Sequence, residues 1–199
     1  MNIKNLALAT CLTAMSATSA SAIVLITAEE VGSDVVFNLS GSYDVSEATF
    51  LRSGDVTIAV NPADRGFGLI NFGPAGSLTT YDIYEVDTSP SGFGPGGDTF
   101  ADSFTGDLFS LNSNGIVPVV GVAPGTTTGT VSGSLTFAGS TFGSLGVTEG
   151  VYDWTWAGDS ARLQIGDINV TPVPLPAGAP LLLAGLAAFG IARRRKKSA

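Results

Sequence analysis

The strongest constraint on the fold is a one-for-one alternation of apolar and polar residues along short stretches of the chain. In "TVSGSLTF", residues 130–137, the apolar Val131, Leu135 and Phe137 fall on one side and hydroxyl side chains fall on the other. A period of two is typical of β-strands that bury one face. Residues 34–43 show the same alternation: Val35, Phe37 and Leu39 fall on one face of the predicted strand, and Val36, Asn38 and Ser40 fall on the other.

Further strands are expected between turns rich in Gly, Ser, Asn and Asp. No stretch of residues 23–172 has a convincing helical period. The sequence therefore predicts an all-β fold, a single antiparallel β-sandwich or jelly-roll domain of acidic character over residues 23–172. The additional strands are predicted at residues 23–27, 55–60, 68–72, 78–86, 109–111, 116–122 and 161–165.

The first 22 residues have the features of an export signal that is removed. Lys4 gives a positive start, residues 6–18 are apolar or small, and Ala20 and Ala22 give the small-x-small pattern that a signal peptidase needs. The apolar run is shorter than the ~20 residues that span a bilayer, which disfavours a permanent anchor. We therefore predict a signal peptide at residues 1–22, cleaved after Ala22.

The C-terminus, "VPLPAGAPLLLAGLAAFGIARRRKK" at residues 173–197, has the features of a membrane span. Residues 181–192 are all apolar or small, and we expect one transmembrane helix at about residues 178–192. A basic cluster follows at once and holds the C-terminus in the cytoplasm, which leaves the body outside. The cluster consists of Arg193, Arg194, Arg195, Lys196 and Lys197.

The five residues Val173, Pro174, Leu175, Pro176 and Ala177, followed by the apolar stretch and the basic cluster, resemble the VPLPA variant of the PEP-CTERM sorting signal. The commoner form has Glu where this chain has Leu175. The resemblance implies that residues 173–199 are a sorting signal of an exported Gram-negative bacterial protein. It also implies recognition by an exosortase, a membrane cysteine protease that cuts near the motif.

Two segments of the body resemble segments that recur in PEP-CTERM proteins. They are "EEVGSDVVFNLSGSYD" and "GVYDWTWAGDSARLQIGDI". This resemblance implies a common exported β domain and brings no known catalytic residues with it.

The charge of the body is strongly one-sided. All seventeen acidic residues lie in residues 23–172, against three basic ones, Arg52, Arg65 and Arg162, although the whole chain has a formal charge of −8. Nucleic acid is excluded as a partner, because binding to its phosphates requires cations. The body also has no cysteine, so no disulfide supports its core.

Catalysis has few groups to work with. The chain has no histidine, so Ser-His-Asp and Cys-His arrangements and the usual zinc sites cannot form. "GDS" at residues 158–160 is similar to the nucleophile block of some esterases, but we expect a turn there. Paired carboxylates could hydrolyse glycosides, and Asp98, Asp102 and Asp107 are the nearest candidates. We expect no enzyme, with a surface hydrolase as an alternative.

The same three aspartates are candidate calcium ligands. They lie in the Gly-rich segment "SGFGPGGDTFADSFTGD", residues 91–107, and hard oxygen ligands on a flexible loop suit Ca²⁺. The favoured alternative is an exposed loop in which Asp98, Asp102 and Asp107 support turns and solubility. No other cofactor is expected.

Tyr152, Trp154 and Trp156 form an aromatic stripe on one face of a predicted strand. If exposed, the stripe would be a platform on which sugar rings stack. If buried, it is the inner face of a sandwich, which is the more frequent situation for large aromatic side chains. The favoured interpretation is burial.

Together, these features predict an exported, non-enzymatic surface or extracellular-matrix protein. The resemblance implies coupling to exopolysaccharide production and biofilm growth. The expected partners are signal peptidase, an exosortase-type membrane protease, the membrane and exopolysaccharide. The chain would pass through a single-pass inner-membrane precursor before it reaches the envelope or matrix. A carbohydrate- or calcium-binding matrix module is the alternative.

Overall fold

Two β-sheets account for nearly all regular structure in the residues that the computed structural model describes, which are 23–56, 58–61, 68–74, 79–113 and 116–167. The six-stranded sheet has the order β12-β13-β1-β2-β11-β8. Its strands are β1 (Ile23–Val31), β2 (Asp34–Asp44), β8 (Ser103–Gly106), β11 (Thr128–Phe137), β12 (Gly150–Trp156) and β13 (Asp159–Ile165).

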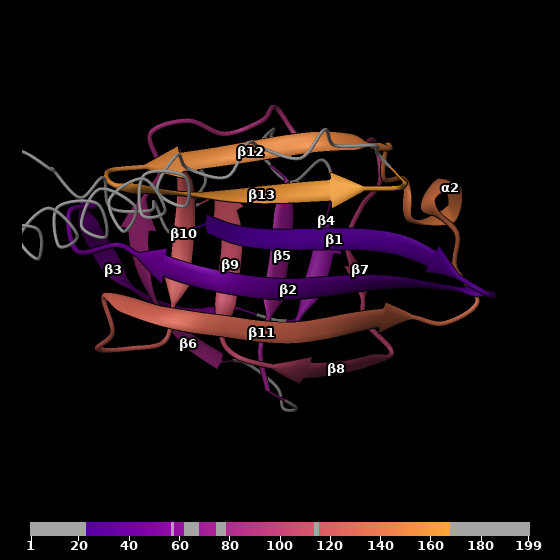
Figure 1. Cartoon of the computed structure of the whole chain (residues 1–199), viewed down its shortest axis with the longest axis horizontal. Helices are drawn as coiled ribbons and strands as arrows, with labels where there is room; N and C mark the ends of the chain where they lie inside the picture. Colours follow the sequence, from indigo (N-terminus) through magenta and orange to yellow (C-terminus); the bar gives the residue numbers. More distant parts are fainter. Residues whose placement is uncertain (1–22, 57, 62–67, 75–78, 114–115, 168–199) are drawn as a thin grey trace, which may run out of the picture. The chain divides into compact units, whose positions relative to one another are not determined.

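The seven-stranded sheet has the order β3-β6-β10-β9-β5-β4-β7. Its strands are β3 (Phe50–Val56), β4 (Ala59–Asn61), β5 (Leu69–Phe72), β6 (Thr79–Glu85), β7 (Thr99–Phe100), β9 (Phe109–Ser113) and β10 (Pro118–Val122). One short helix, α2 (Phe142–Leu145), lies near the ends of β1 and β13 (Figure 1).

The two sheets lie one behind the other, and their strands cross (Figure 1). The strands of the six-stranded sheet run across the view in front, and most strands of the seven-stranded sheet run down the view behind them. Crossed packing of this kind places the inner faces of both sheets against one core. The prediction of an all-β fold is confirmed, and the arrangement is sandwich-like.

One strand pair departs from the antiparallel prediction. β1 and β13 are parallel, from Ile23 beside Ser160 to Ala28 beside Ile165, whereas the other pairs are antiparallel. The other side of β1 is already occupied by β2, so the returning β12–β13 hairpin adds to the remaining side. As a consequence, β1 starts at one end of this sheet and β13 finishes at the opposite end.

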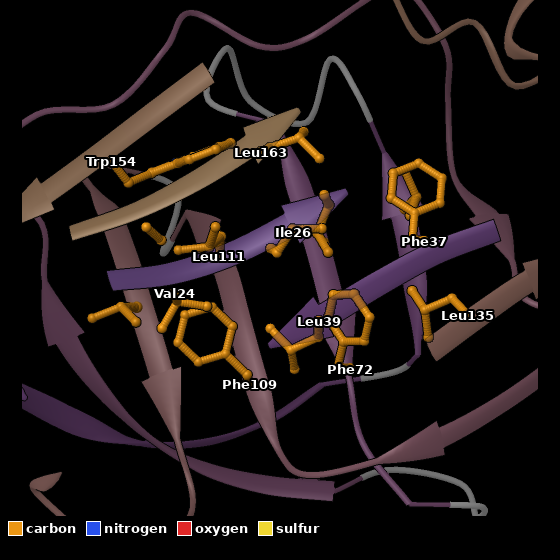
Figure 2. Packing of buried hydrophobic residues seen from close by; sticks show 14 of the residues in the cluster. Val24, Ile26, Phe37, Leu39, Phe72, Phe109, Leu111, Leu135, Trp154 and Leu163 are labelled. Carbon is orange, nitrogen blue, oxygen red and sulfur yellow. The ribbon is translucent and has the colours of Figure 1, made fainter. Parts of the chain in front are cut away.

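The core between the sheets is built from the apolar rows that the alternation predicted. Val35, Phe37 and Leu39 are at most 3% exposed, and Val131 and Leu135 are at most 4% exposed. Figure 2 shows side chains of both sheets in this core, among them Ile26 and Leu163 of the six-stranded sheet and Phe72, Phe109 and Leu111 of the seven-stranded sheet. Burying each such side chain contributes about 1.5–3 kcal/mol.

A smaller apolar cluster covers the other face of the seven-stranded sheet. Tyr81, Ile83 and Val119 are its buried members. The Tyr81 hydroxyl donates to the main-chain oxygen of Phe72, and burial raises the pKa of this phenol well above its ordinary value. The second sheet therefore has buried apolar side chains outside the main core as well.

The predicted strand at residues 55–60 is wrong as a single element. The chain leaves β3 at Val56 and starts β4 at Ala59, and the two strands lie at opposite sides of the seven-stranded sheet. β3 pairs with β6, whereas β4 pairs with β5 and β7. The apolar–polar alternation of the sequence does not indicate that the chain crosses from one side of the sheet to the other between β3 and β4.

The predicted targeting elements lie outside the described residues. These are the signal peptide at 1–22 and the sorting signal at 173–199 with its helix at 178–192. Contacts divide the chain into a unit Met1–Ile168 and a unit Asn169–Ala199, and the second unit is not among the described residues. Within the described ranges, no helix has the length and apolar character required to cross a membrane.

Candidate functional site

The aromatic stripe of β12 faces the core. Trp154 is fully buried and Trp156 is 3% exposed, while Tyr152 is half-buried. The Trp156 Nε1–H donates to the main-chain oxygen of Asp44 at 2.8 Å. The favoured prediction of burial is confirmed. The alternative of a sugar-stacking platform is wrong, because the rings of both tryptophans are covered by protein.

The Gly-rich segment before β7 packs against this stripe. Phe93 is 1% exposed, and its ring lies edge-on to Tyr152 and Trp154, with centroids 6.0 and 6.5 Å apart. Its neighbour Gly94 has φ +151°, and a Cβ there would lie 2.1 Å from the main-chain oxygen of Gly146. The glycines therefore permit close backbone packing around a buried phenylalanine.

Asp98, Asp102 and Asp107, the candidate calcium ligands and catalytic carboxylates, do not form a common site in the structure. Asp102 and Asp107 flank β8, one at each end, so strand rise separates their Cα atoms by roughly 16 Å. Catalytic carboxylate pairs in glycosidases lie within about 5–10 Å of each other. Asp98 precedes β7 and is exposed. In the described part of the chain, no group of three or more His, Cys, Asp or Glu residues is placed to hold a metal ion.

Asp102 and Asp107 instead support the edge of β11. The Asp102 carboxylate accepts from the main-chain N–H of Ala138 at 2.8 Å. The Asp107 carboxylate accepts from the main-chain N–H of Ser132 at 2.9 Å and from its hydroxyl at 3.2 Å. Each aspartate also donates its own N–H to β11, Asp102 to Thr136 and Asp107 to Ser132. Their structural role is to fix β8 against β11.

Asp159 is a buried carboxylate that the sequence did not single out for a role. It follows the turn at Gly158, which has φ +86°, so the predicted turn at "GDS" is confirmed at Gly158, whereas Asp159 and Ser160 begin β13. Asp159 is 5% exposed and accepts from the N–H groups of Asp44 and Ser160, each at 2.7 Å. Burial raises the pKa of this carboxyl above its ordinary value. Together with Trp156, it ties the end of β2 to the β12–β13 turn.

An acidic cleft of about 460 Å³ lies where β1 and β13 end. Among its described lining residues there is no cation, so the cleft repels anions. The Glu30 carboxylate is also engaged, because it accepts from the N–H of Phe142 at 2.6 Å. The acidic lining residues are Glu29, Glu30, Glu149 and Asp167.

A second cleft, of about 480 Å³, lies beside the first half of β11 and is here called the β11-edge cleft. It is less charged than the acidic cleft, with Asp107 as its acidic lining residue. Apolar surface comes from Pro74, Leu108, Ala123 and Val131. This combination suits a ligand that is partly apolar.

No protein-family model, curated protein or solved structure matches the chain. The sorting motif (173–177), the basic cluster (193–197) and the signal cleavage residues Ala20 and Ala22 lie outside the described residues. The candidate sites within the described residues are therefore the two clefts.

Proposed function

We propose that this chain is an exported, non-enzymatic protein of the bacterial surface or extracellular matrix, sorted by an exosortase-type membrane protease. The observation that carries the proposal is the order of elements along the sequence. The predicted export signal ends at Ala22, and the motif at residues 173–177 is followed by an apolar stretch and five adjacent cations. A soluble core helix gains nothing from five adjacent cations, whereas a membrane span is oriented by them.

In this proposal the precursor is anchored by a helix at residues 178–192, with the tail at residues 193–197 in the cytoplasm. The β domain, a sandwich or jelly roll, is then outside the inner membrane. The proposal fits the chain on the N-terminal side, because β1 begins at Ile23, directly after the predicted cleavage site. On the C-terminal side, residues 168–172 connect the domain to the motif.

The non-enzymatic assignment is supported by the chemistry of the described domain. The chain has no histidine, and the candidate carboxylates of Asp102 and Asp107 are too far apart for glycoside hydrolysis. The domain instead offers a strongly acidic surface, which suits solubility and weak association with cationic matrix components. The resemblance to PEP-CTERM proteins supports a role in exopolysaccharide-rich biofilm.

The proposal is tested by expressing the full chain in a bacterium that has an exosortase-type system. We expect the wild type outside the inner membrane without its tail. The double variant Pro174→Ala, Pro176→Ala should accumulate as a membrane-bound precursor. Pro180→Ala, which changes a proline outside the motif, is the matched control and should be sorted like the wild type. Equal sorting of the double variant would show that the motif is not what the machinery reads.

A further inference from the structure

One edge of the six-stranded sheet is only partly paired. β11 pairs with β2 along its whole length, from Thr128 to Phe137. On its other side, β8 covers only Gly133–Thr136. The pairing ends where the Asp107 N–H donates to the Ser132 oxygen at 2.8 Å and the Asp107 carboxylate accepts from the Ser132 N–H.

Among the described residues, no strand lies beside the next main-chain groups of β11. In an antiparallel ladder, alternate residues direct both N–H and C=O to the same neighbour. The main-chain groups of Ser132 and Thr136 bond toward β8. The main-chain N–H and C=O groups of Thr128 and Thr130 therefore point to the same side of β11. No main-chain hydrogen bond from the described residues reaches Thr128 or Thr130 there. Within the described part of the chain, two donors and two acceptors of β11 are therefore unpaired on this side, and an added strand can pair with them.

The β11-edge cleft lies directly beside these groups. Thr128, Thr130 and Val131 line it on the strand side, and Leu108 and Pro74 line it as well. Tyr43 also lines the cleft, and its hydroxyl is 2.8 Å from the Thr126 hydroxyl oxygen. An open ladder next to a partly apolar hollow is the arrangement that binds extended peptides, since the edge pairs with the main chain and the hollow takes a side chain.

The other sheet edges are partly covered, irregular or short. At β12, the N–H and C=O of Thr155 already bond with Thr88, at 3.0 and 3.1 Å. β3 has a bulge between Phe50 and Arg52, which disrupts pairing with another chain. β7 and β8 are only two and four residues long. Among the described strands, β11 thus combines an open ladder with a cleft.

The charge around the open edge of β11 indicates which kind of segment can bind there. Asp107 stands at the end of the open ladder, and the described residues contain only two cations, Arg52 and Arg162. Arg162 is paired with Asp153 at 2.7 Å. A second copy of this chain would bring two Asp107 carboxylates and two acidic domains together, which electrostatic repulsion opposes. A basic segment of another protein meets no such repulsion.

We propose that the edge of β11 at residues 128–131, with the β11-edge cleft, binds an extended cationic segment of a partner protein, which adds to the six-stranded sheet as a strand. An apolar side chain of the segment enters the cleft, and a lysine or arginine lies beside Asp107. The proposal is independent of how the chain is sorted.

The test uses the full chain and a fluorescein-labelled alternating valine–lysine hexapeptide, with binding followed by fluorescence polarisation. We expect saturable binding. The same peptide with N-methyl groups on alternate amides cannot complete the ladder and should bind at least tenfold more weakly. A peptide with glutamate in place of lysine should bind at least tenfold more weakly too. These two comparisons use the unaltered protein, so they do not depend on the folding of a variant.

Two variants locate the site. Thr130→Pro removes an outward N–H from the edge, and Ala123→Trp fills the cleft; each should weaken binding at least tenfold. The matched control is Val151→Pro, which places proline at an outward position of the β12 edge and should leave binding within twofold of the wild type. Absence of binding to the wild type, or equal binding by the Thr130→Pro and Val151→Pro proteins, would overturn the proposal. So would self-association of the wild type that Thr130→Pro abolishes, because the occupant would then be a second copy.

Discussion

Trp154 and Trp156 lie on the same face of β12, but their indole N–H groups differ. The Trp156 Nε1–H donates to the Asp44 oxygen at 2.8 Å, whereas the buried Trp154 Nε1–H has no hydrogen-bond partner among the described residues. A buried polar group without a partner costs about 1–3 kcal/mol. Replacing each tryptophan with phenylalanine is therefore the same chemical change with opposite consequences for hydrogen bonding.

The expected change in unfolding free energy follows from two contributions. Phenylalanine leaves a cavity of roughly 40 Å³ at either position, which costs about 1 kcal/mol. At Trp154 the change also removes an unpartnered donor and regains about 1–3 kcal/mol, so Trp154→Phe should be as stable as the wild type or up to about 2 kcal/mol more stable. At Trp156 the change deprives the Asp44 oxygen of its donor, so Trp156→Phe should lose about 2–4 kcal/mol.

Urea unfolding of the full chain, followed by far-ultraviolet circular dichroism, measures both values without relying on tryptophan fluorescence. Trp154→Ala serves as the reference for a large core deletion and should lose about 3–5 kcal/mol. Equal losses for the two phenylalanine variants, or a larger loss at Trp154, would refute this account of the two indoles.

Three further predictions concern the loop, the carboxylates and metal. Gly94→Ala should lower the melting temperature, because its Cβ would meet the Gly146 oxygen at 2.1 Å, whereas Gly97→Ala has nothing within 4 Å of the new Cβ and should not. The Gly125 N–H holds the pKa of Asp82 below its ordinary value of 3.8. The ionised Asp82 carboxylate therefore stabilises the fold above pH 3.8, and this stabilisation is lost as the pH falls through the lowered pKa. Asp82→Asn should therefore be less stable than the wild type near neutral pH and equal to it in strong acid; a gap that persists in acid would contradict the assignment. Calcium or EDTA should leave the melting temperature unchanged, and a calcium-dependent rise would contradict the structural role of the loop aspartates.

The period-two alternation predicts the strands of the core well, because a half-buried strand needs one apolar face whatever its partners are. It identifies the inward rows of β2, β11 and β12, whose positions the structure confirms. The burial of Trp154 and Trp156 is also predictable, because large aromatic side chains on a strand face usually belong to the core.

Pairing and short edge strands are less predictable. β8, "SFTG", contributes only one apolar side chain to the core, that of Phe104, and Asp102 and Asp107 fix the strand against β11. The parallel pairing of β1 with β13 joins segments from the two ends of the domain, and local periodicity carries no information on such contacts. The β11-edge cleft likewise depends on where β8 stops, which is set by hydrogen bonds of Asp107 and not by a motif.

We propose that the chain is exported and that its C-terminal label is removed. The most direct test is the intact mass of the wild-type protein recovered from a bacterium with an exosortase-type system. We expect a mass that lacks residues 1–22 and also lacks residues 178–199. A recovered mass that still includes residues 178–199 would contradict sorting and would leave a single-pass membrane anchor.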